Sequence, residues 1–291
     1  MRIATWNINS LRARMPRLLE VIDTRNIDVI ALQEIKAKPE QLDLSGLTER
    51  GFEVAAHGFN QWNGVAIASR VGLREVRREI PSIPAWGEGD DGVVEARAIG
   101  AVVGDASSDC APLELWSLYV PNGRELDNPH YPYKLAWLEA LRNYAASRLD
   151  AGGPGEAPGE DSATLFAGDF NVAPTDADVW DMAAFEGKTH VSGPERDAIA
   201  ALENAGYADL TRDWLDAPGT YTYWDYKGLK FAKKQGMRID FLFGSPAVRA
   251  ATTGAMIDLA ERAQKSTSDP APVIVDVELE GSPGRQQASE I

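Results

Sequence analysis

The chain is poor in cysteine and in long apolar runs. Cys110 is the only cysteine among 291 residues, which excludes an internal disulfide and a cysteine-based metal site. No apolar run approaches the roughly 18 residues that a membrane-spanning helix needs. The first residues, RIATWNI, read as a strand and not as the hydrophobic region of a signal peptide. These absences predict a cytoplasmic protein with no membrane partner.

Positive charge is also scarce. The sequence has 29 Lys and Arg against 44 Asp and Glu, a formal net charge of −15, and this balance taken alone argues against a nucleic-acid partner. The cations are nevertheless clustered beside polar motifs, at Arg12, Arg14, Arg17, Lys36, Lys38, Lys227, Lys230, Lys233, Lys234 and Arg238. We interpret them as a cationic rim on an acidic body, with ordinary solvated surface as the alternative.

Hydrophobic periodicity predicts more strands than helices. Helices are expected at Leu11–Arg25, Tyr133–Leu149 and Glu195–Ala205. Strands are expected at Ile3–Ile8, Ile27–Gln33, Phe52–Ala56, Gly64–Ser69, Val93–Val103, Leu113–Val120, Thr164–Ala167, Ile239–Phe243 and Val273–Val277. Several of these strands are adjacent hairpins, which favours an α/β (α+β) fold: a four-layered sandwich of two packed mixed β-sheets flanked by helices.

The domain organisation depends on the Gly/Pro/Glu-rich segment Ala151–Ala163, which has the composition of a linker. The polar motifs described next lie on both sides of it, so a boundary there would divide them. We therefore expect a single domain over residues 1–280 and a disordered tail at 281–291.

Polar side chains end several of the predicted apolar strands. Asn7, Glu34, the pair Asp169 and Asn171, and Asp240 each follow such a run, and a further motif lies at Ser268–Pro272. If these strand ends converge, their carboxylates repel one another unless a hard cation lies among them. The set predicts a metal-dependent, phosphate-cleaving site.

Each of these residues also has a structural explanation when it is considered alone. Glu34 could be a surface acid and Asn7 a turn residue. Tyr119 and Trp224 could be core aromatics, and Asp240 could form a salt bridge with Arg238. The prediction therefore depends on the joint occurrence of the motifs and on their order along the chain.

That ordered set resembles the exonuclease III and abasic-site endonuclease family, within the larger endonuclease/exonuclease/phosphatase fold that includes DNase I. The similarity runs from about Arg2 to Val277. The motifs that carry it are TWNINSLRAR, IDVIALQEIK, NGVAI, YVPNG, GDFNVAPTDADVWD, YTYWDY, MRIDFLFGS and SDPAPVIVD. The resemblance implies a DNase I-like fold and phosphodiester hydrolysis.

The resemblance also implies roles for individual residues. Glu34 is the implied principal ligand of Mg²⁺, with Mn²⁺ as an alternative cation. The implied metal set is Asn7, Asn9, Glu34, Asp169, Asn171 and Asp269. Asp169 is implied to orient or deprotonate the attacking water, and Asp240 to organise the site. The implied catalytic set is Tyr119, Asp169, Asn171, Asp240 and Asp269.

Substrate binding is implied for a second group of residues. Asn122 is expected to donate to the scissile phosphate together with Asn171, and Lys134 is expected to contact substrate. An apolar pocket for a base-free deoxyribose is implied at Tyr223, Trp224, Met237 and Ile239. An abasic sugar fits such a pocket where a full nucleotide does not.

One position departs from the family pattern. The chain reads Ser-Asp-Pro-Ala-Pro at residues 268–272 where the family has Ser-Asp-His-Ala-Pro, and proline offers neither a side-chain donor nor a backbone N–H. We expect reduced activity. The other histidines are His57, His130 and His190. A surface or structural role is the simpler interpretation for each, and His190 is the strongest candidate for a substitute.

The leading hypothesis is a magnesium-dependent DNA repair nuclease. It incises duplex DNA 5′ to abasic sites and trims 3′ ends, as a monomer. Two alternatives stay open: a catalytically impaired DNA-damage binding protein of the same fold, and a phosphoesterase of the larger fold that acts on a small molecule or lipid.

Overall fold

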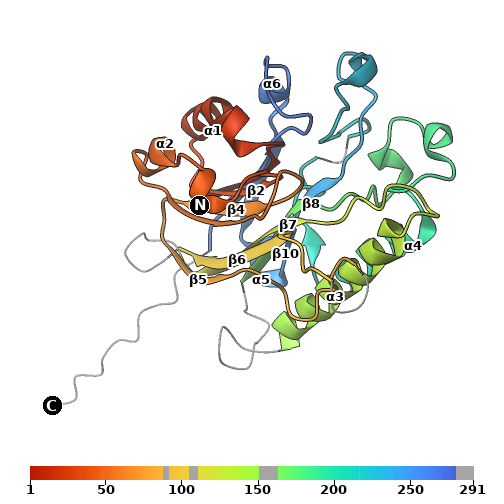
Figure 1. Ribbon diagram of the computed structural model, residues 1–291, viewed down its shortest axis with the longest axis horizontal. Coiled ribbons are helices and arrows are strands. Elements are labelled where there is room, and N and C mark those ends of the chain that lie inside the picture. Colours follow the sequence, from red (N-terminus) through yellow and green to blue (C-terminus); the bar gives the residue numbers. More distant parts are fainter. Residues whose placement is uncertain (88–91, 105–110, 151–162, 216, 280–291) are drawn as a thin grey trace.

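The structure, a computed structural model, describes residues 1–87, 92–104, 111–150, 163–215 and 217–279. Cys110, most of the Gly/Pro/Glu-rich segment and the predicted tail at 281–291 lie outside the described residues. Two six-stranded mixed sheets pack face to face, and helices cover their outer faces (Figure 1). This arrangement confirms the predicted four-layered α/β sandwich of the DNase I-like type.

The first sheet has the strand order β11-β12-β1-β2-β4-β3. Its strands are β1 (Arg2–Asn7), β2 (Val29–Gln33), β3 (Glu53–His57), β4 (Val65–Ser69), β11 (Thr252–Ile257) and β12 (Val273–Val277). β1 and β2 are parallel, in a register that sets Asn7 beside Gln33, and α1 (Leu11–Arg25) connects them. The carboxyl ends of both strands therefore meet at one edge of the sheet.

The second sheet has the order β5-β6-β7-β8-β10-β9. Its strands are β5 (Leu73–Arg77), β6 (Ala98–Val103), β7 (Leu113–Tyr119), β8 (Thr164–Asp169), β9 (Ala208–Asp209) and β10 (Asp240–Gly244). β7 and β8 are parallel and set Tyr119 beside Asp169. β10 runs antiparallel to β8 and sets Asp240 beside Asp169.

Three apolar layers hold the sandwich together. Between the sheets, alternate residues of facing strands interdigitate, among them Val29, Ile67, Leu115 and Leu165. Trp6 and its neighbours pack against α1 and α2 (Ser45–Thr48) on the first sheet. On the second sheet, Trp116, Phe166 and Phe243 pack in one cluster with residues of α3 (His130–Asp150) and α4 (Gly193–Asn204), among them Trp137 and Ile199. Alternation along the strands is what allows each sheet to bury both faces.

Most of the predicted elements are present. The helix Leu11–Arg25 and the strand Val273–Val277 have the predicted bounds. The predicted strand Val93–Val103 is wrong in its first half, because β6 begins at Ala98. Before it, Val93 forms only an isolated bridge, and Arg97 N bonds Glu95 O within a tight turn.

Other boundaries and elements also differ from the prediction. The helix predicted at Tyr133–Leu149 is α3, which begins at His130. The strands β5, β9 and β11 were not predicted: β5 and β11 have partly exposed residues on both faces, and β9 has only two residues. Short helices also follow β10 and β11, α5 (Pro246–Ala250) and α6 (Leu259–Arg262). Among the described residues, no helix has the length and apolar character required to span a membrane.

Candidate active site

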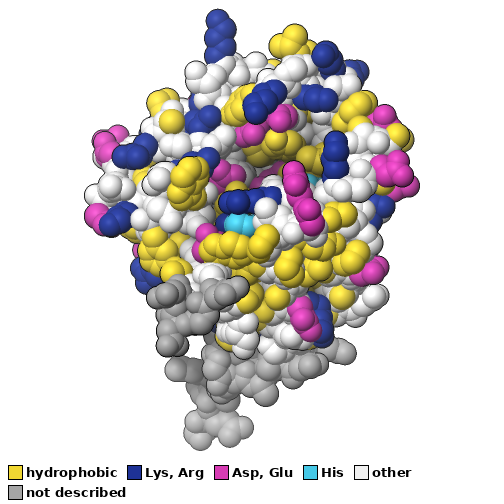
Figure 2. All heavy atoms as spheres, turned by 45° about the vertical axis from the view of Figure 1, so that its right-hand side comes forward, with side chains coloured by type: hydrophobic (Ala, Val, Ile, Leu, Met, Phe, Trp, Pro, Cys, Tyr) yellow, Lys and Arg dark blue, Asp and Glu magenta, His cyan; other side chains and the backbone are white. Residues whose placement is uncertain are grey.

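The polar strand ends converge where the two sheets meet. Asn7 ends β1, Tyr119 ends β7, Asp169 ends β8, and Glu34 directly follows β2. Asp240 starts β10 and joins them because that strand is antiparallel to its neighbour. Figure 2 shows a hollow on one face of the molecule, with acidic side chains and a histidine inside it and Lys and Arg side chains around it.

A chain of hydrogen bonds connects the predicted metal ligands. Asn7 Nδ2 donates to Glu34 Oε1 at 2.8 Å and to Asp169 Oδ2 at 3.0 Å. Asn9 Nδ2 donates to Asp269 Oδ1 at 3.1 Å. Lys36 Nζ lies 2.7 Å from Glu34 Oε2 and 2.7 Å from Asn9 Oδ1, so an ammonium group neutralises part of this negative charge. The predicted residues are thus in contact.

Burial and mutual repulsion shift the acidity of these carboxyls. Burial raises the pKa of Asp169 to about 7; the Asn7 amide opposes this shift and the charge of Glu34 adds to it. The pKa of Asp240 is well above its ordinary value, first through burial and then through Asp169. Burial also raises the pKa of Asp269. The site thus holds four carboxyl groups, those of Glu34, Asp169, Asp240 and Asp269. A bound divalent cation would offset their mutual repulsion.

The donor set fits an oxygen-preferring cation. Among the described residues, no three His, Cys, Asp or Glu side chains are already arranged to hold a metal. Asp240 Oδ1, however, is buried and has no hydrogen-bond partner there, and a buried polar atom without a partner is costly. The carboxylate and amide oxygens available beside it are the ligand type of Mg²⁺ and Mn²⁺, not of softer metals.

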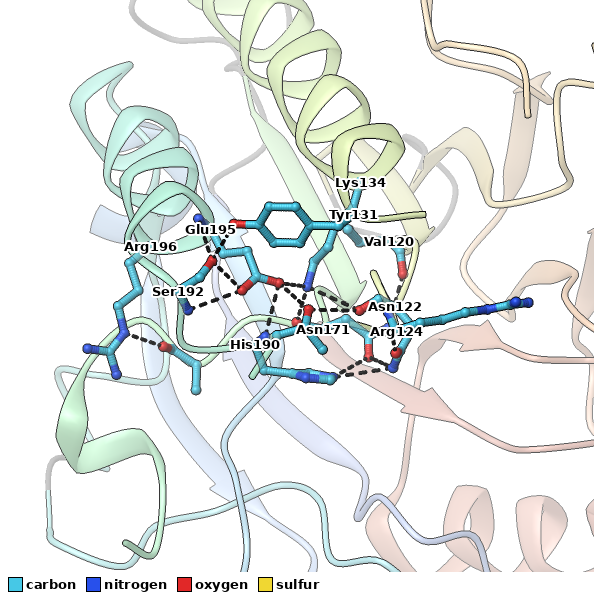
Figure 3. A network of polar contacts seen from close by, with 12 residues as sticks. Val120, Asn122, Arg124, Tyr131, Lys134, Asn171, His190, Ser192, Glu195 and Arg196 are labelled. Atoms are coloured by element: carbon cyan, nitrogen blue, oxygen red, sulfur yellow. Dashed lines mark hydrogen bonds and ion pairs between the residues drawn. The ribbon is translucent and has the colours of Figure 1, made fainter. Parts of the chain in front are cut away.

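Two amides form the wall next to the carboxylates. Asn122 Nδ2 donates to Asn171 Oδ1 at 2.9 Å, and Asn171 Nδ2 donates to the Val120 carbonyl at 3.0 Å. His190 Nε2 lies 3.3 Å from Asn122 Nδ2 and 3.3 Å from Asn171 Oδ1 (Figure 3). The strongest candidate among the histidines is therefore in the site, beside the amides and not beside Asp269.

Tyr119 lies beside Asp169 in the parallel pairing of β7 with β8. Its hydroxyl is hydrogen-bonded to Glu34, and burial is the main cause that raises the pKa of this phenol, so it stays protonated and able to donate. The guanidinium of Arg97 lies 4.8 Å from the centre of the Tyr119 ring. This cation–π contact restrains the ring, and no sequence motif indicates it.

Lys134 does not lie where a substrate could reach it, which corrects its predicted role. Its side chain is fully buried and forms an ion pair with Glu195. Its Nζ also donates to the Asn171 carbonyl. Lys134 thus supports the loop that carries Asn171. Glu195 was missed, although Ser192 and Glu195 have the spacing of a helix capping box.

Three of the four residues predicted to form the sugar pocket pack together. Tyr223, Met237 and Ile239 pack in one apolar cluster, with Val179 and Val191. Trp224 belongs to a different cluster, with Tyr221 and Phe231, because neighbouring residues of an extended segment point to opposite sides. Trp224 therefore does not pack with the other three predicted pocket residues.

Pro270 lies at the border of this pocket. It forms an isolated bridge with Tyr223, and its carbonyl accepts a hydrogen bond from Trp6 Nε1 at 3.0 Å. The neighbouring Ser268 Oγ donates to the Asn7 carbonyl at 2.7 Å. The segment therefore keeps its place against β1 without an imidazole.

Several site residues have an unusual backbone. Asn9, Glu34, Asn171 and His190 all have positive φ, at 46°, 52°, 52° and 79°. Non-glycine residues rarely adopt this conformation, and where it occurs it concentrates at functional sites. Side-chain convergence and backbone strain thus identify the same place.

Comparisons with known proteins agree with this geometry. Residues 4–269 match the Endonuclease/Exonuclease/phosphatase family. Exodeoxyribonuclease III of Haemophilus influenzae is 28% identical over 94% of this chain and 98% of its own length. The 3′ phosphatase NExo from Neisseria, solved with a product DNA hairpin, has a TM-score of 0.84 at 32% identity, covering 96% of this chain and 99% of that one.

An archaeal structure extends the comparison. The AP endonuclease from Archaeoglobus fulgidus has a TM-score of 0.81 at 25% identity and covers 96% of this chain and 99% of that chain. Similarity thus spans nearly the whole molecule and includes every strand that delivers a site residue. The chain belongs to the endonuclease/exonuclease/phosphatase family, in its exodeoxyribonuclease III and AP endonuclease branch, and is a phosphodiester-hydrolysing nuclease.

Proposed function

We propose that the chain is a magnesium-dependent DNA repair nuclease that incises duplex DNA 5′ to abasic sites and trims 3′ ends. The observation that carries the proposal is the contact between the carboxylates of Glu34 and Asp169, through Asn7, beside the amides of Asn122 and Asn171. A relative of the same fold was solved with product DNA. We also propose that the protein acts as a monomer in the cytoplasm.

The residues suggest how hydrolysis proceeds. Water attacks the phosphorus, and its proton passes to Asp169, whose raised pKa suits a general base near neutral pH. The bond from phosphorus to the 3′ oxygen breaks, and solvent supplies a proton to that oxygen. Asn122 and Asn171 donate to the non-bridging oxygens as their negative charge grows. The Tyr119 hydroxyl can also donate to a phosphate oxygen.

Glu34 is the residue best placed to hold the cation, with Asn7, Asn9, Asp169, Asn171 and Asp269 completing the predicted set. When bound, Mg²⁺ would supply charge stabilisation at the phosphoryl oxygens. The apolar cluster of Tyr223, Met237 and Ile239 excludes water from the sugar and favours a deoxyribose without a base.

A nicking assay tests the proposal. A 5′-labelled duplex with one tetrahydrofuran abasic analogue is incubated with the protein in Mg²⁺ or in EDTA, beside the same duplex without the lesion. We expect one nick 5′ to the analogue, in Mg²⁺ only, and slower shortening of 3′ ends. Asp169→Asn is the matched inactive control. Nicking that is equal in EDTA would contradict the metal dependence.

Pro270 favours a second candidate function, a damage-site binding protein with impaired turnover. It predicts a lesion-dependent gel shift without a nick at high protein concentration. Pro270→His separates the two: a positioned acid–base group contributes roughly 10²- to 10⁴-fold in rate, so incision should increase if this position limits turnover. An unchanged rate would show that it does not. Hydrolysis of bis-p-nitrophenyl phosphate without DNA cleavage would favour a small-molecule phosphoesterase.

A further inference from the structure

His190 occupies a position that its loop alone does not explain. Its ring nitrogen Nε2 is within 3.3 Å of side chains from two different strand ends, Asn122 after β7 and Asn171 after β8 (Figure 3). Those two amides are bonded to each other at 2.9 Å. The three groups form a closed triangle on the wall where the phosphate is proposed to bind.

The loop holds this ring in place through backbone contacts. His190 N donates to Glu195 Oε1 at 3.0 Å, and the His190 carbonyl accepts from Ala173 N at 2.7 Å. Its φ of 79° is a conformation that costs energy for a residue with a side chain. Glu195 also binds Lys134, which in turn donates to the Asn171 carbonyl. One buried ion pair therefore fixes both His190 and Asn171.

The other histidines have no such contact. His130 stacks on Trp86 with ring centres 3.8 Å apart and contacts Asn128. His57 has its ring against Phe59, with centres 4.9 Å apart. Across the site, Pro270 offers no donor at all. Hydrogen-bond donors for the phosphate on this wall therefore come mainly from the two amides, so their orientation matters.

We propose that His190 is a positioning residue that fixes the side-chain amides of Asn122 and Asn171 for the scissile phosphate. This inference rests on the proposed function. Asn122 Nδ2 has two hydrogens and gives one of them to Asn171 Oδ1. The neutral ring with hydrogen on Nε2 donates to Asn171 Oδ1, which leaves the second hydrogen of Asn122 Nδ2 for the phosphate. This bond opposes rotation of the amide pair and keeps Asn122 Nδ2 toward the site.

Fixed amides act on the transition state more than on substrate binding. A donor already aimed at a growing negative charge needs no reorganisation during the reaction. Loss of His190 leaves the amides present but free to rotate. The expected result is a lower kcat with little change in KM, which is the pattern of an interaction made in the transition state.

A double-mutant cycle on the nicking substrate tests this role. We expect His190→Ala to lower kcat on the order of 10²-fold, as for a small misplacement of catalytic groups, and His190→Gln, which keeps a donor and an acceptor, to lose much less. In an Asn171→Ala background, which removes the acceptor of the proposed His190 bond, His190→Ala should cost no more than about two-fold. His130→Ala is the matched control and should change kcat little in either background.

Additive losses in the cycle would overturn the proposal, as would equal losses for His190→Ala and His190→Gln. A rise in KM alone would also overturn it, since that indicates a ground-state contact. Melting temperatures of all variants show whether a loss comes from unfolding, and His190→Gln keeps the test valid if His190→Ala does not fold. A wild-type protein that cuts no DNA contradicts the proposed function instead, so the two failures are distinct.

Discussion

At the residue scale, the proposed general base Asp169 makes stability depend on pH. Burial raises the pKa of its carboxyl from 3.8 to about 7, so the folded protein binds this proton more tightly than the unfolded chain does. The resulting stabilisation is complete below about pH 4 and is lost as the pH rises towards 7. At 1.36 kcal/mol per pKa unit, it amounts to about 4 kcal/mol at most.

Asp169→Asn should therefore abolish nicking and flatten part of this pH dependence. In metal-free buffer, the melting temperature of the wild type should fall between pH 4 and pH 7. The melting temperature of the variant should fall less over this range and should be higher than that of the wild type at pH 7. Thermal melts followed by circular dichroism measure both. Asp176→Asn, at an exposed carboxyl paired with Arg196, is the control. Parallel curves for wild type and Asp169→Asn would contradict the assignment.

At the element scale, Lys134 of α3 and Glu195 of α4 form an ion pair with no solvent exposure. Removing one partner leaves the other charge buried, which costs about 3–5 kcal/mol. We expect Lys134→Met to lower the free energy of unfolding by this amount in urea denaturation. Combining it with Glu195→Gln should recover much of the loss.

An exposed pair offers the contrast for this experiment. Arg249 and Asp213 are joined at 3.0 Å, and more than half of each side chain is exposed to solvent, so Arg249→Gln should cost less than about 1 kcal/mol. If Lys134→Met cost as little as Arg249→Gln, then α3 and α4 would not depend on the buried pair to support Asn171.

The close approach of β7 and β8 depends on Gly168. A Cβ at this position would lie 1.9 Å from the Leu118 carbonyl oxygen, which is a backbone atom and cannot move aside. Gly168→Ala should destabilise the protein by about 3 kcal/mol or more and displace Asp169, with a lower denaturation midpoint and lost nicking. Gly193→Ala, where nothing lies within 4 Å of the added Cβ, should leave both unchanged.

The sequence predicted the elements better than their contacts. The apolar run before Glu34 ends at Gln33 as expected, whereas β1 ends one residue before the predicted Ile8 and β8 ends two residues after the predicted Ala167. The parallel pairing that brings them together follows from the helix between consecutive strands. The sequence could not reveal that Lys134 points inward, since an amphipathic helix pattern does not show a buried cation whose partner lies 61 positions away.

His190 and Trp224 show the same limit within the site. The loop before α4 contains no periodic pattern, and its course depends on the capping contacts of Glu195. The histidine could therefore be named as a candidate but not placed. For Trp224, the prediction grouped adjacent residues of YTYWDY, whereas an extended chain directs neighbours to opposite sides.

At the scale of the whole molecule, an acidic protein has to bind a polyanion. The net charge of −15 would repel DNA at long range, and salt screens that repulsion beyond about 10 Å at 0.1 M ionic strength. Binding then depends on the cations close to the site. Lys233 and Lys234 are exposed in the segment between Trp224 and Met237, and Lys230 is partly buried, with Nζ 5.0 Å from the centre of the Trp180 ring.

Salt dependence of DNA binding measures these contacts. Each neutralised phosphate contributes about −0.9 to the slope of log K against log salt concentration, so Lys233→Gln with Lys234→Gln should make the slope shallower by about 2. Fluorescence anisotropy with a labelled abasic duplex in EDTA measures binding without cleavage. Arg50→Gln, at a partly buried arginine that follows α2 and pairs with Asp23 of α1, should leave the slope unchanged. Because the control removes one charge and the lysine variant two, a control change half as large as that of the lysine variant would assign the effect to net charge and not to a cationic rim.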